Sequence, residues 1–436
     1  MVYTLWRDPL SVWGRAHFDL PIVMADTILG RRAAISDPAA IRRVLLDNAG
    51  NYRKDELQLR VLRPGLGDGL LTVEGDAWKA QRRALAPMFS PRQVANFAAP
   101  MHKVARAAAE RIAGAAADRP LAFDTEMTLT TLQVLEQTLF SQGLGRSATD
   151  FQRAVTRYFD TFGRIDPLDL LGAPDFIPRL SRLRGRDSLA FFDNAVEMIV
   201  EARKQLIASG AEPPTDLLTL LLRAADPETG KHMSERDVRS NIVTFIGAGH
   251  ETTSNALTWA TYLLSQSPYW RQRVEAEVDE AFDPDSDADP SAALPVTRAV
   301  IEEALRLYPP ASIVLREAIG EDWLCGQRIP AGAVVTLAPY VVHRHRRLWK
   351  DPDLFDPSRF LGENREKIDR FAYFPFGAGP RVCIGMAFAL QEAVIVLAHL
   401  IRRFRFELAP GCVVEPHQRV TLRPRNGLQV IVHRRG

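Results

Sequence analysis

Hydrophobic and polar positions alternate differently in successive parts of the chain. Near the N-terminus, alternation over 21–25 and 33–36 predicts two short strands with Gly30 between them. Asp37 followed by Pro38 is typical of a helix start, because aspartate caps the first free N–H groups and proline has no N–H to satisfy. We therefore expect a small strand region followed by a helix that reaches residue 48.

The next segment, residues 53–74, keeps no steady period because Pro64 and the glycines at 65, 67 and 69 interrupt it. We predict a loop there. From Asp76 onward a helical period returns. Proline or glycine breaks it at residues 87, 91, 120, 143, 167 and 174. These breaks divide the segment into a series of helices.

The longest predicted helix spans 234–267. Ser234 and Asp237 have the spacing of a capping box, and Pro268 ends the pattern. The Asp/Pro/Ser-rich tract that follows, 282–295, predicts a surface loop. Strand-like alternation then returns over 325–337 and 418–433.

No internal repeat and no linker rich in glycine and serine divides this order of elements. The pattern therefore predicts a single domain over residues 1–436. Its fold class is mainly α with small β-sheets (α+β), with a large helical body.

Composition narrows the function classes. The chain has 436 residues, with 55 Lys and Arg against 53 Asp and Glu, so a net charge of +2 supplies no field for binding nucleic acid. Its three cysteines are too few for a disulfide framework and indicate a reducing compartment. No apolar run is long enough for a signal peptide or a transmembrane anchor. We expect a cytoplasmic protein.

The most informative stretch surrounds Cys383. Glycines and prolines over 375–380 predict a tight loop, and the run after Gly385 is a strong helix former, so Cys383 lies at a helix N-terminus. The helix dipole there favours a thiolate, to which Arg381 adds positive charge, and Phe376 can shield it. Such a thiolate suits a soft metal ion. A small core residue and a catalytic nucleophile remain open for a lone cysteine.

The full spacing, Phe-x-x-Gly-x-Arg-x-Cys-x-Gly, closely resembles the haem-binding loop of the cytochrome P450 family. All its fixed positions are filled here: Phe376, Gly379, Arg381, Cys383 and Gly385. The resemblance implies haem b as cofactor, with Cys383 as the ligand of the iron. It also implies the fold of that family, in which a long central helix lies over the haem, and haem contacts from Phe376, Gly377, Arg381 and Gly385.

Three other motifs strengthen the resemblance. Glu303 and Arg306 match the family's Glu-x-x-Arg motif, and Arg359 lies in its downstream Pro-x-Arg-Phe motif. In the family these three side chains form a buried ion network. Trp78 and Arg82, one helical turn apart, match positions that face a haem propionate. By the same analogy Arg381 serves the other propionate, and Arg316 is a further candidate.

A last motif lies within the longest predicted helix. Ala248 to Thr253 read Ala-Gly-His-Glu-Thr-Thr, in which Gly249 and Thr252 are weak helix formers. A conflict of this kind is expected at a functional site. The motif matches the family's oxygen-binding groove, so the resemblance places Ala248 and Gly249 against the haem. Glu251 and Thr252 are then the catalytic residues that deliver protons.

The resemblance implies a monooxygenase that inserts one atom of dioxygen into a hydrophobic small molecule by hydroxylation or epoxidation. A haem-thiolate peroxygenase or isomerase, and a non-enzymatic haem sensor, remain alternatives. The pocket is expected from segments that include 53–74 and 160–200, with an apolar wall of residues Phe245, Ala248, Ile313, Val314 and Leu428.

Electrons are expected from a separate ferredoxin, or a flavodoxin, and its NAD(P)H reductase. The docking site is expected near the Cys383 loop, on the basic residues Arg344, Arg346, Arg347, Lys350 and Arg381. His343-Arg344-His345 lacks further ligands at metal-binding spacing and is interpreted as a solvated basic face. Gly65 to Gly69 do not form a dinucleotide fingerprint, because no strand precedes them.

Overall fold

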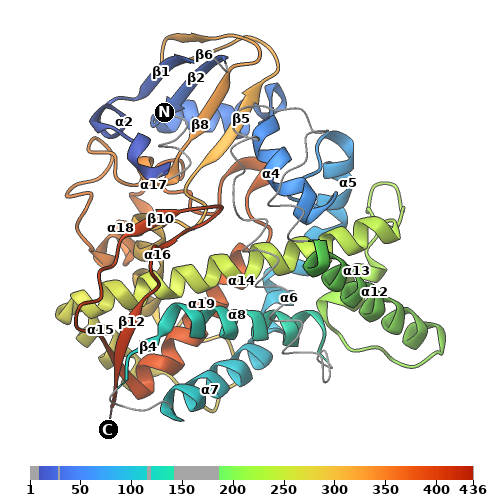
Figure 1. The fold of residues 1–436 in the computed structure, drawn as a ribbon, viewed down its shortest axis with the longest axis vertical. Helices are drawn as coiled ribbons and strands as arrows, with labels where there is room; N and C mark the ends of the chain where they lie inside the picture. Colours follow the sequence, from blue (N-terminus) through green and yellow to red (C-terminus); the bar gives the residue numbers. More distant parts are fainter. Residues whose placement is uncertain (1–8, 28–29, 115–118, 142–185, 436) are drawn as a thin grey trace.

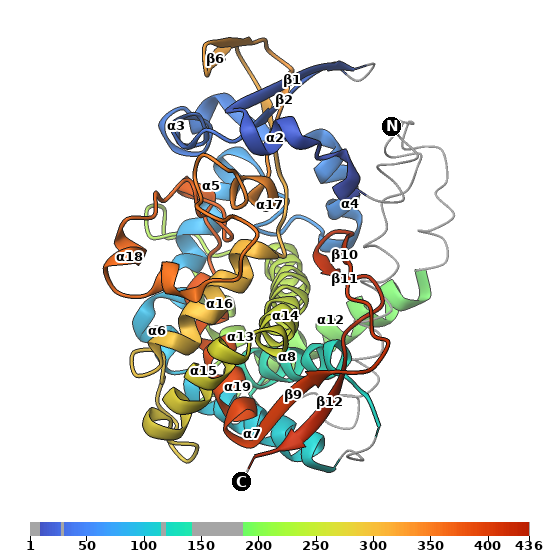
Figure 2. The same ribbon diagram turned by 90° about the vertical axis from the view of Figure 1, so that its left-hand side faces the viewer.

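The computed structural model describes residues 9–27, 30–114, 119–141 and 186–435. A five-stranded sheet lies at one end of the molecule, and a body of helices fills the rest (Figure 1). One helix, α14 (Glu235–Gln266), crosses the body from side to side. Seen along its axis in Figure 2, it has other elements around it. This is the expected mainly α architecture with small sheets.

The five-stranded sheet has the order β1-β2-β8-β5-β3. β1 and β2 form an antiparallel hairpin, β2 and β8 are parallel, and β8, β5 and β3 are antiparallel. The strands are β1 (Ile22–Thr27), β2 (Gly30–Ile35), β3 (Tyr52–Lys54), β5 (Val314–Ala318) and β8 (Val334–Leu337). The sheet thus joins residues near the N-terminus to residues some 300 positions later.

Three smaller sheets complete the β structure of the described residues. They pair β4 and β9 with β12 in the middle, β6 with β7, and β10 with β11. Their bounds are β4 (Leu121–Ala122), β6 (Asp322–Leu324), β7 (Gln327–Ile329), β9 (Phe404–Leu408), β10 (Pro416–Gln418), β11 (Leu422–Pro424) and β12 (Gln429–Arg434).

A first set of helices precedes α14 in the chain and lies on more than one side of it (Figure 1). They are α2 (Arg15–Asp19), α3 (Pro38–Arg42), α4 (Glu56–Leu66), α5 (Gly75–Leu85), α6 (Pro91–Ala95), α7 (Ala98–Gly114), α8 (Phe123–Leu139), α12 (Arg186–Ala208) and α13 (Leu217–Arg223). Short 3-10 turns are η1 (Pro9–Val12), η3 (Ala49–Asn51) and η4 (Ala86–Phe89), and η2 (Arg43–Asp47) is a π-helical segment that continues α3.

A second set of helices follows α14 in the chain. They are α15 (Pro268–Ala281), α16 (Pro295–Leu307), α17 (Pro339–Val342), α18 (Glu363–Glu366) and α19 (Met386–Arg403), with turns η6 (Pro357–Phe360) and η7 (Gly379–Arg381). One large hydrophobic core joins α7, α8, α14, α16 and α19, and a second core lies beneath the five-stranded sheet.

The predicted helix starts are confirmed. The side chain of Asp37 accepts from the N–H of Ala40 at 2.9 Å, with Pro38 as the first residue of α3. Ser234 and Asp237 form the predicted capping box of α14. Such a cap contributes about 1 kcal/mol. The helix runs without a break through its glycines, because most of its length is buried among other helices.

One secondary-structure prediction was wrong. Residues 56–66 form helix α4 instead of a loop, because Pro64 lies in the last turn and Gly67, at φ 62°, ends the helix just beyond it. The strand-like stretches over 325–337 and 418–433 do contain strands, β7 and β8 in the first and β11 and β12 in the second, divided by turns. Cys325 and Gly326 adopt positive φ between β6 and β7, and Gly332 does so before β8.

The tract 282–295 is a loop as predicted, with its two ends anchored. Phe282 and Leu294 are buried, and the carbonyl of Ala288 accepts from His102 Nε2 at 2.8 Å. Because that nitrogen carries the proton, His102 Nδ1 accepts from His399 Nε2 at 2.9 Å. Two neutral histidines therefore connect the loop to α7 and α19, and burial lowers both their pKa values.

The prediction of a solvated basic face at 343–345 was wrong, because all three side chains are buried. His343 Nδ1 donates to the carbonyl of Arg306, and its Nε2 accepts from the N–H of Phe374 at 3.0 Å. Arg344 lies over the rings of Tyr308 and Tyr340. Burial and the charge of Arg306 lower the pKa of His343 to about 3. Neutral histidine thus serves as a structural connector.

These histidines predict loss of stability in mild acid. In the unfolded chain, His343 and His399 become protonated below about pH 6.5. In the folded protein they stay neutral until about pH 3, because their pKa values are lowered to about 3. The contribution of these histidines to the free energy of unfolding should therefore be fully present above pH 6.5. Below that pH it should fall by about 1.4 kcal/mol per pH unit for each histidine. Denaturant unfolding at several pH values measures this slope.

His399→Gln is the matched variant, because its amide can still donate to His102 but does not titrate in this range. Its free energy of unfolding should fall less steeply between pH 6.5 and 5 than that of the unaltered protein. Equal slopes for the two proteins would contradict the assignment.

Candidate functional site

The Cys383 loop is a compact turn held by its own backbone. The N–H of Cys383 donates to the carbonyl of Phe376 at 2.8 Å, and the N–H of Gly377 donates to that of Phe374. η7 closes the loop, and α19 begins at Met386 with Gly385 as its N-cap. The predicted position of Cys383, just before a helix N-terminus, is therefore confirmed.

Gly379 is a position of this loop at which no residue with a side chain can fit. Its φ is 69°, and a Cβ at this position would lie 1.8 Å from the carbonyl oxygen of Leu45 in η2. Gly377 also has positive φ, at 71°. Only glycine allows the loop to turn this way and to pack directly on η2.

Cys383 is exposed, yet it lies deep among protein atoms, so it faces a space inside the molecule. Burial raises the pKa of its thiol, and the Gly385 N–H and the charge of Arg82 offset part of that effect. The neighbouring cation is thus Arg82, and not Arg381 as the sequence suggested. Arg381 instead pairs with Glu74 at 2.9 Å.

The predicted ion network lies behind the loop and is confirmed. Glu303 and Arg306 are both completely buried and form two hydrogen bonds, of 2.6 and 2.8 Å. Arg359 approaches Glu303 at 3.6 Å. Arg306 also donates to the carbonyls of His343, Pro352 and Leu354. These bonds satisfy the buried charge and fix the chain that leads into the Cys383 loop.

The middle of α14 forms another part of the candidate site. Ala248 is exposed although the residues around it on α14 are mostly buried, so it too faces an internal space. The hydroxyl of Thr252 donates to the carbonyl of Ala248 at 2.7 Å. Gly249 packs on α8 instead, where a Cβ would lie 3.1 Å from Leu135. Its absent side chain lets the two helices approach.

Glu251 points toward the C-terminal strands. Its Oε1 accepts from the hydroxyl of Thr421 at 2.5 Å and lies 3.8 Å from Arg423 Nη1. The sequence alone offered no signal for either partner, because both lie about 170 residues away in the chain.

Two of the predicted propionate contacts lie together. The guanidinium of Arg381 stacks on the ring of Trp78 at 4.2 Å. Arg82, one turn beyond Trp78 on α5, has no hydrogen-bond or ion-pair partner among the described residues. Burial lowers its pKa, and the negative charge of Cys383 raises it.

A second group of cations lies at the edge of the five-stranded sheet, and sequence reasoning found only part of it. Lys54 and Arg316 are direct partners across β3 and β5, and only 6% and 8% of their surfaces are exposed. Arg316 donates to the carbonyl of Leu315, and Lys54 to that of Leu71. Neither has a carboxylate partner within the described ranges.

Like charges directly opposite on adjacent strands are unfavourable, and burial adds to that cost. Burial and the charge of Arg381 lower the pKa of Lys54 to about 7 and that of Arg316 to about 10. Glu74, the anion acting on this group, is paired with Arg381. The site therefore carries an excess of buried positive charge.

A porphyrin with two carboxylates fits this charge balance. Among the described residues, Arg82, one helical turn from Trp78, and the pair Lys54 and Arg316 have no carboxylate partner, and Cys383 supplies one soft ligand. Within the described ranges, no three His, Cys, Asp or Glu side chains converge to hold a metal ion by themselves. A porphyrin would supply the remaining ligands of a metal ion held at Cys383.

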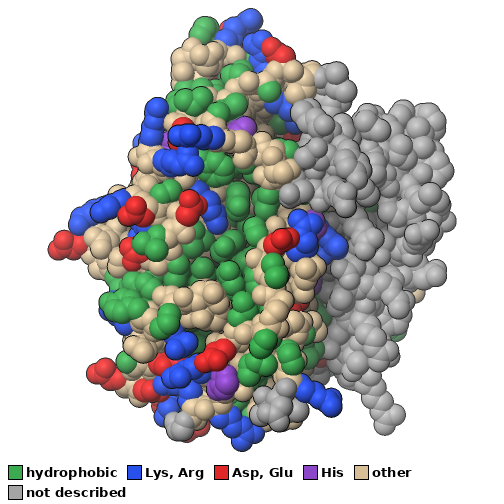
Figure 3. Space-filling view, turned by 60° about the vertical axis from the view of Figure 1, so that its left-hand side comes forward, with side chains coloured by type: hydrophobic (Ala, Val, Ile, Leu, Met, Phe, Trp, Pro, Cys, Tyr) green, Lys and Arg blue, Asp and Glu red, His purple; other side chains and the backbone are tan. Residues whose placement is uncertain are grey.

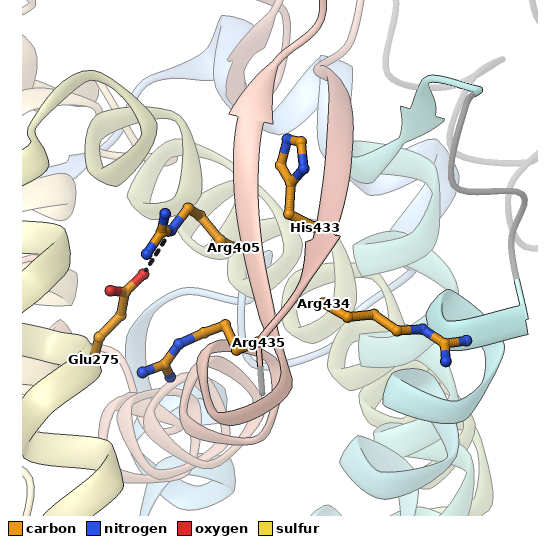
Figure 4. Close-up of a pocket in the computed structure, with 5 residues that line it drawn as sticks. All are labelled: Glu275, Arg405, His433, Arg434 and Arg435. Carbon is orange, nitrogen blue, oxygen red and sulfur yellow. Dashed lines mark hydrogen bonds and ion pairs between the residues drawn. The ribbon is translucent and has the colours of Figure 1, made fainter.

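Two surface features lie elsewhere. Figure 3 shows hydrophobic side chains gathered in the middle of one face, with charged side chains around them. Figure 4 shows a pocket of about 340 Å³ near the C-terminus, lined by Glu275, Arg405, His433, Arg434 and Arg435. Arg405 and Arg435 there pair with Glu275 and Asp279. Two of its three arginines are thus paired with carboxylates, and the third, Arg434, donates to the carbonyl of Ala113.

Comparison with known proteins decides the family. The family model described as cytochrome P450 matches residues 27–432. The chain belongs to the cytochrome P450 family. A crystal structure of the cytochrome P450DA heme domain superposes with a TM-score of 0.83 at 26% identity, covering 95% of this chain and 90% of that one. The predicted fold is therefore confirmed.

Two relatives come from Streptomyces melanosporofaciens. Cyclooctat-9-en-7-ol 5-monooxygenase is 33% identical over 93% of this chain and 87% of the relative. Cyclooctatin synthase is 34% identical over 88% of this chain and 83% of the relative. The chain is thus an enzyme of the cytochrome P450 monooxygenase type, a family that implies haem. No helix in the described ranges is long and apolar enough to cross a membrane.

The unbalanced cations of this cytochrome P450 predict opposite effects of Lys54→Met on the apoprotein and on haem binding. Removing a buried cation opposite Arg316 should raise the melting temperature of the apoprotein by a few degrees (~1 kcal/mol). Removing a charged donor to a carboxylate should speed haem transfer to excess apomyoglobin about tenfold.

Lys231→Met is the control, because Lys231 is exposed and lies in the turn before α14. This variant should change neither quantity. A Lys54→Met apoprotein with a lower melting temperature, or unaltered haem transfer, would show that Lys54 is only a packing residue.

Proposed function

We propose that this protein is a haem b–dependent monooxygenase that inserts one oxygen atom of dioxygen into a hydrophobic small molecule. One observation carries the proposal: a single cysteine, set at a helix start and facing the interior, is accompanied by buried cations without anionic partners. That combination suits an iron porphyrin and is unnecessary for a buried core cysteine. The monooxygenase relatives support it.

The residues present divide the work of holding haem b. Cys383 would bind the iron, with its thiolate supported by the Gly385 N–H and by Arg82. Arg82 with Trp78 would receive one propionate, and Arg316 with Lys54 and Arg381 the other. Phe376, Gly377 and Gly385 would line the thiolate side. When bound, haem supplies the dioxygen activation and the oxygen insertion.

The face of α14 that carries Ala248 and Thr252 would form the opposite wall. The Thr252 hydroxyl, bonded to the Ala248 carbonyl, is placed to hold a water molecule by hydrogen bonding. Glu251, on the same turn and partly exposed, can take a proton from solvent at its carboxylate and pass it to that water. Retention of this acid and alcohol favours a monooxygenase over the peroxygenase, isomerase and sensor alternatives.

The substrate is proposed to be hydrophobic. Phe245 packs edge-on against Phe89, and Ala248, Ile313 and Val314 are at least partly exposed. Leu428, which was expected in this wall, is completely buried and packs in the main core instead. Part of the expected pocket, residues 160–185, lies outside the described residues. A relative named for the oxidation of cyclooctat-9-en-7-ol is in keeping with this substrate class.

Cys383→Ala tests the assignment directly. Reduced wild-type protein under carbon monoxide should show the strongly red-shifted Soret band of a thiolate ligand, and the variant should lose it. Cys412→Ala is the control and should keep the band, because Cys412 lies in the turn after β9, far from the loop in sequence. A red-shifted band in Cys383→Ala, or none in the wild type, would overturn the proposed haem-thiolate function.

Electrons are proposed to come from a small acidic ferredoxin, or a flavodoxin, that docks over the Cys383 loop. The expected docking residues need revision. Arg344 is buried, Arg381 pairs with Glu74 and stacks on Trp78, and Arg346 pairs with Asp19. Arg347 and Lys350 remain exposed, without an ion-pair partner among the described residues.

The surface immediately around the loop offers another docking site. η2 contacts the loop through Leu45, and its Leu46 is 41% exposed. α6 packs on α19 through the bond from Gln391 to the Val94 carbonyl, and it presents the exposed Arg92. Met386, the first residue of α19, is 40% exposed. An apolar centre with a cation at its edge suits a small acidic partner.

Arg92→Glu should therefore slow transfer of the first electron from a surrogate ferredoxin several-fold, measured by stopped-flow reduction under carbon monoxide. The wild-type rate should fall as salt rises, since charges beyond about 10 Å are screened at 0.1 M. Lys231→Glu is the control with the same charge change. If Arg347→Glu slows reduction and Arg92→Glu does not, the partner docks beside α17, and this surface is wrong.

A further inference from the structure

The hairpin formed by β10 and β11 contacts α14 at the residue proposed to deliver protons. Thr421, in the turn between the strands, is only 6% exposed, and its hydroxyl lies between two side chains of α14. Asn255 Nδ2 donates to that hydroxyl at 3.2 Å, and the hydroxyl lies 2.5 Å from Glu251 Oε1. Because an amide nitrogen can only donate, the hydroxyl proton of Thr421 is directed to Glu251.

Arg423, two residues along the hairpin, faces the same oxygen. Its Nη1 lies 3.8 Å from Glu251 Oε1, and its side chain is 28% exposed. Both hairpin contacts therefore reach Oε1, and Oε2 has no protein partner among the described residues. The Glu251 side chain is 22% exposed, which allows solvent to approach. Among ionisable groups, Arg423 on the hairpin and His250 on α14 act on Glu251.

The hairpin is well anchored, so its position relative to α14 is fixed. The carbonyl of Leu422 accepts from Trp259 Nε1 at 3.3 Å, and its N–H donates to the carbonyl of Pro310 at 3.0 Å. Trp259 is completely buried. Thr421 and Arg423 lie on either side of this anchor. They can thus hold one carboxylate oxygen without moving themselves.

We propose that Thr421 and Arg423 are positioning residues for Glu251, holding Oε1 so that Oε2 alone carries protons from solvent toward Thr252. The inference rests on the proposed monooxygenase function. In each transfer the O–H bond at Oε2 breaks, and the proton passes to the water held by Thr252. The carboxylate left behind takes a proton from solvent water, and the electrons come from the redox partner.

Geometry separates this role from simple packing of the hairpin. The Trp259 and Pro310 contacts already fasten the hairpin to the body, so the bond from Thr421 is not needed to hold it. A charge-assisted hydrogen bond of 2.5 Å instead fixes the carboxylate, which has several rotatable bonds of its own. Fixing a proton donor within hydrogen-bond reach of its acceptor is what general acid catalysis requires.

Thr421→Val tests the inference, because valine has the shape of threonine but no hydroxyl. The holoprotein is supplied with NADPH, a surrogate ferredoxin and its reductase, with 7-ethoxycoumarin as the probe. The variant should lower kcat about tenfold, and it should enlarge the solvent deuterium isotope effect on kcat about twofold. KM and the melting temperature should stay close to those of the wild type.

Three further variants complete the set. Thr421→Ser restores the hydroxyl and should recover kcat to within about twofold, whereas Arg423→Gln, at the longer contact, should lose about threefold. Val420→Ala, an exposed neighbour in the same turn, is the control and should behave as wild type. A crystal structure of Thr421→Val should show Glu251 turned away from its wild-type position.

The outcomes distinguish the two proposals. If Thr421→Val matches Val420→Ala in kcat and isotope effect, or leaves Glu251 in place in the crystal, the positioning role is wrong while the monooxygenase function stands. If the wild type consumes no NADPH and lacks the red-shifted carbon monoxide band, the monooxygenase function fails. In that case the crystal structure alone decides whether the hairpin holds Glu251.

Discussion

Glu303 and Arg306 are completely withdrawn from solvent, and the rest of the site is assembled around their ion pair. A buried pair of this kind is tolerable only when every donor and acceptor is used. Arg306 meets this demand by donating to Glu303 and to the carbonyls of residues 343, 352 and 354. Satisfying one guanidinium therefore fixes a long irregular segment that has almost no secondary structure of its own.

His343 extends this constraint to the Cys383 loop. Its ring joins the carbonyl of Arg306 to the N–H of Phe374, immediately before the turn that presents Cys383. The loop then packs on η2 through Gly379, where a side chain would meet the Leu45 carbonyl. The neutral imidazole of His343 and the missing Cβ of Gly379 thus fix the position of the Cys383 loop and its thiol.

Charge is distributed unequally over the molecule. Many arginines near the surface are paired with carboxylates, including Arg405 and Arg435 of the pocket near the C-terminus. Lys54 and Arg316 are buried and Arg82 is partly buried, and none of the three has a carboxylate partner in the described ranges. The fold stores an electrostatic cost there, which binding of a dianionic cofactor would relieve. We infer that cofactor binding and final stability are coupled through these residues.

α14 has to serve both the core and the site. Trp259 and Leu257 pack in the hydrophobic interior, while Ala248 and Thr252, a few turns earlier, face an open space. Gly249 is needed by the packing side, since it allows close approach to Leu135 of α8. Within this short motif, Gly249 therefore serves helix packing, whereas Ala248 and Thr252 line the candidate site.

The sequence by itself determined the family and the order of elements, and it pointed to Cys383 as the proposed ligand of the cofactor. Those features are local: a capping box, a proline at a helix start, and a ten-residue spacing around Cys383 each depend on neighbours in the chain. The ion network of Glu303, Arg306 and Arg359 was also within reach, because its motifs are short and regular.

Only the tertiary structure decided which charged side chains are buried and what they face. His343 and Arg344 looked like surface residues because their neighbours are basic, yet contacts with distant elements bury them. Lys54 gains its significance from a cross-strand partner 262 positions later, and Glu251 from a hairpin about 170 residues away. Burial and charge pairing depend on contacts between segments that are far apart in the chain. A local sequence pattern does not predict those contacts.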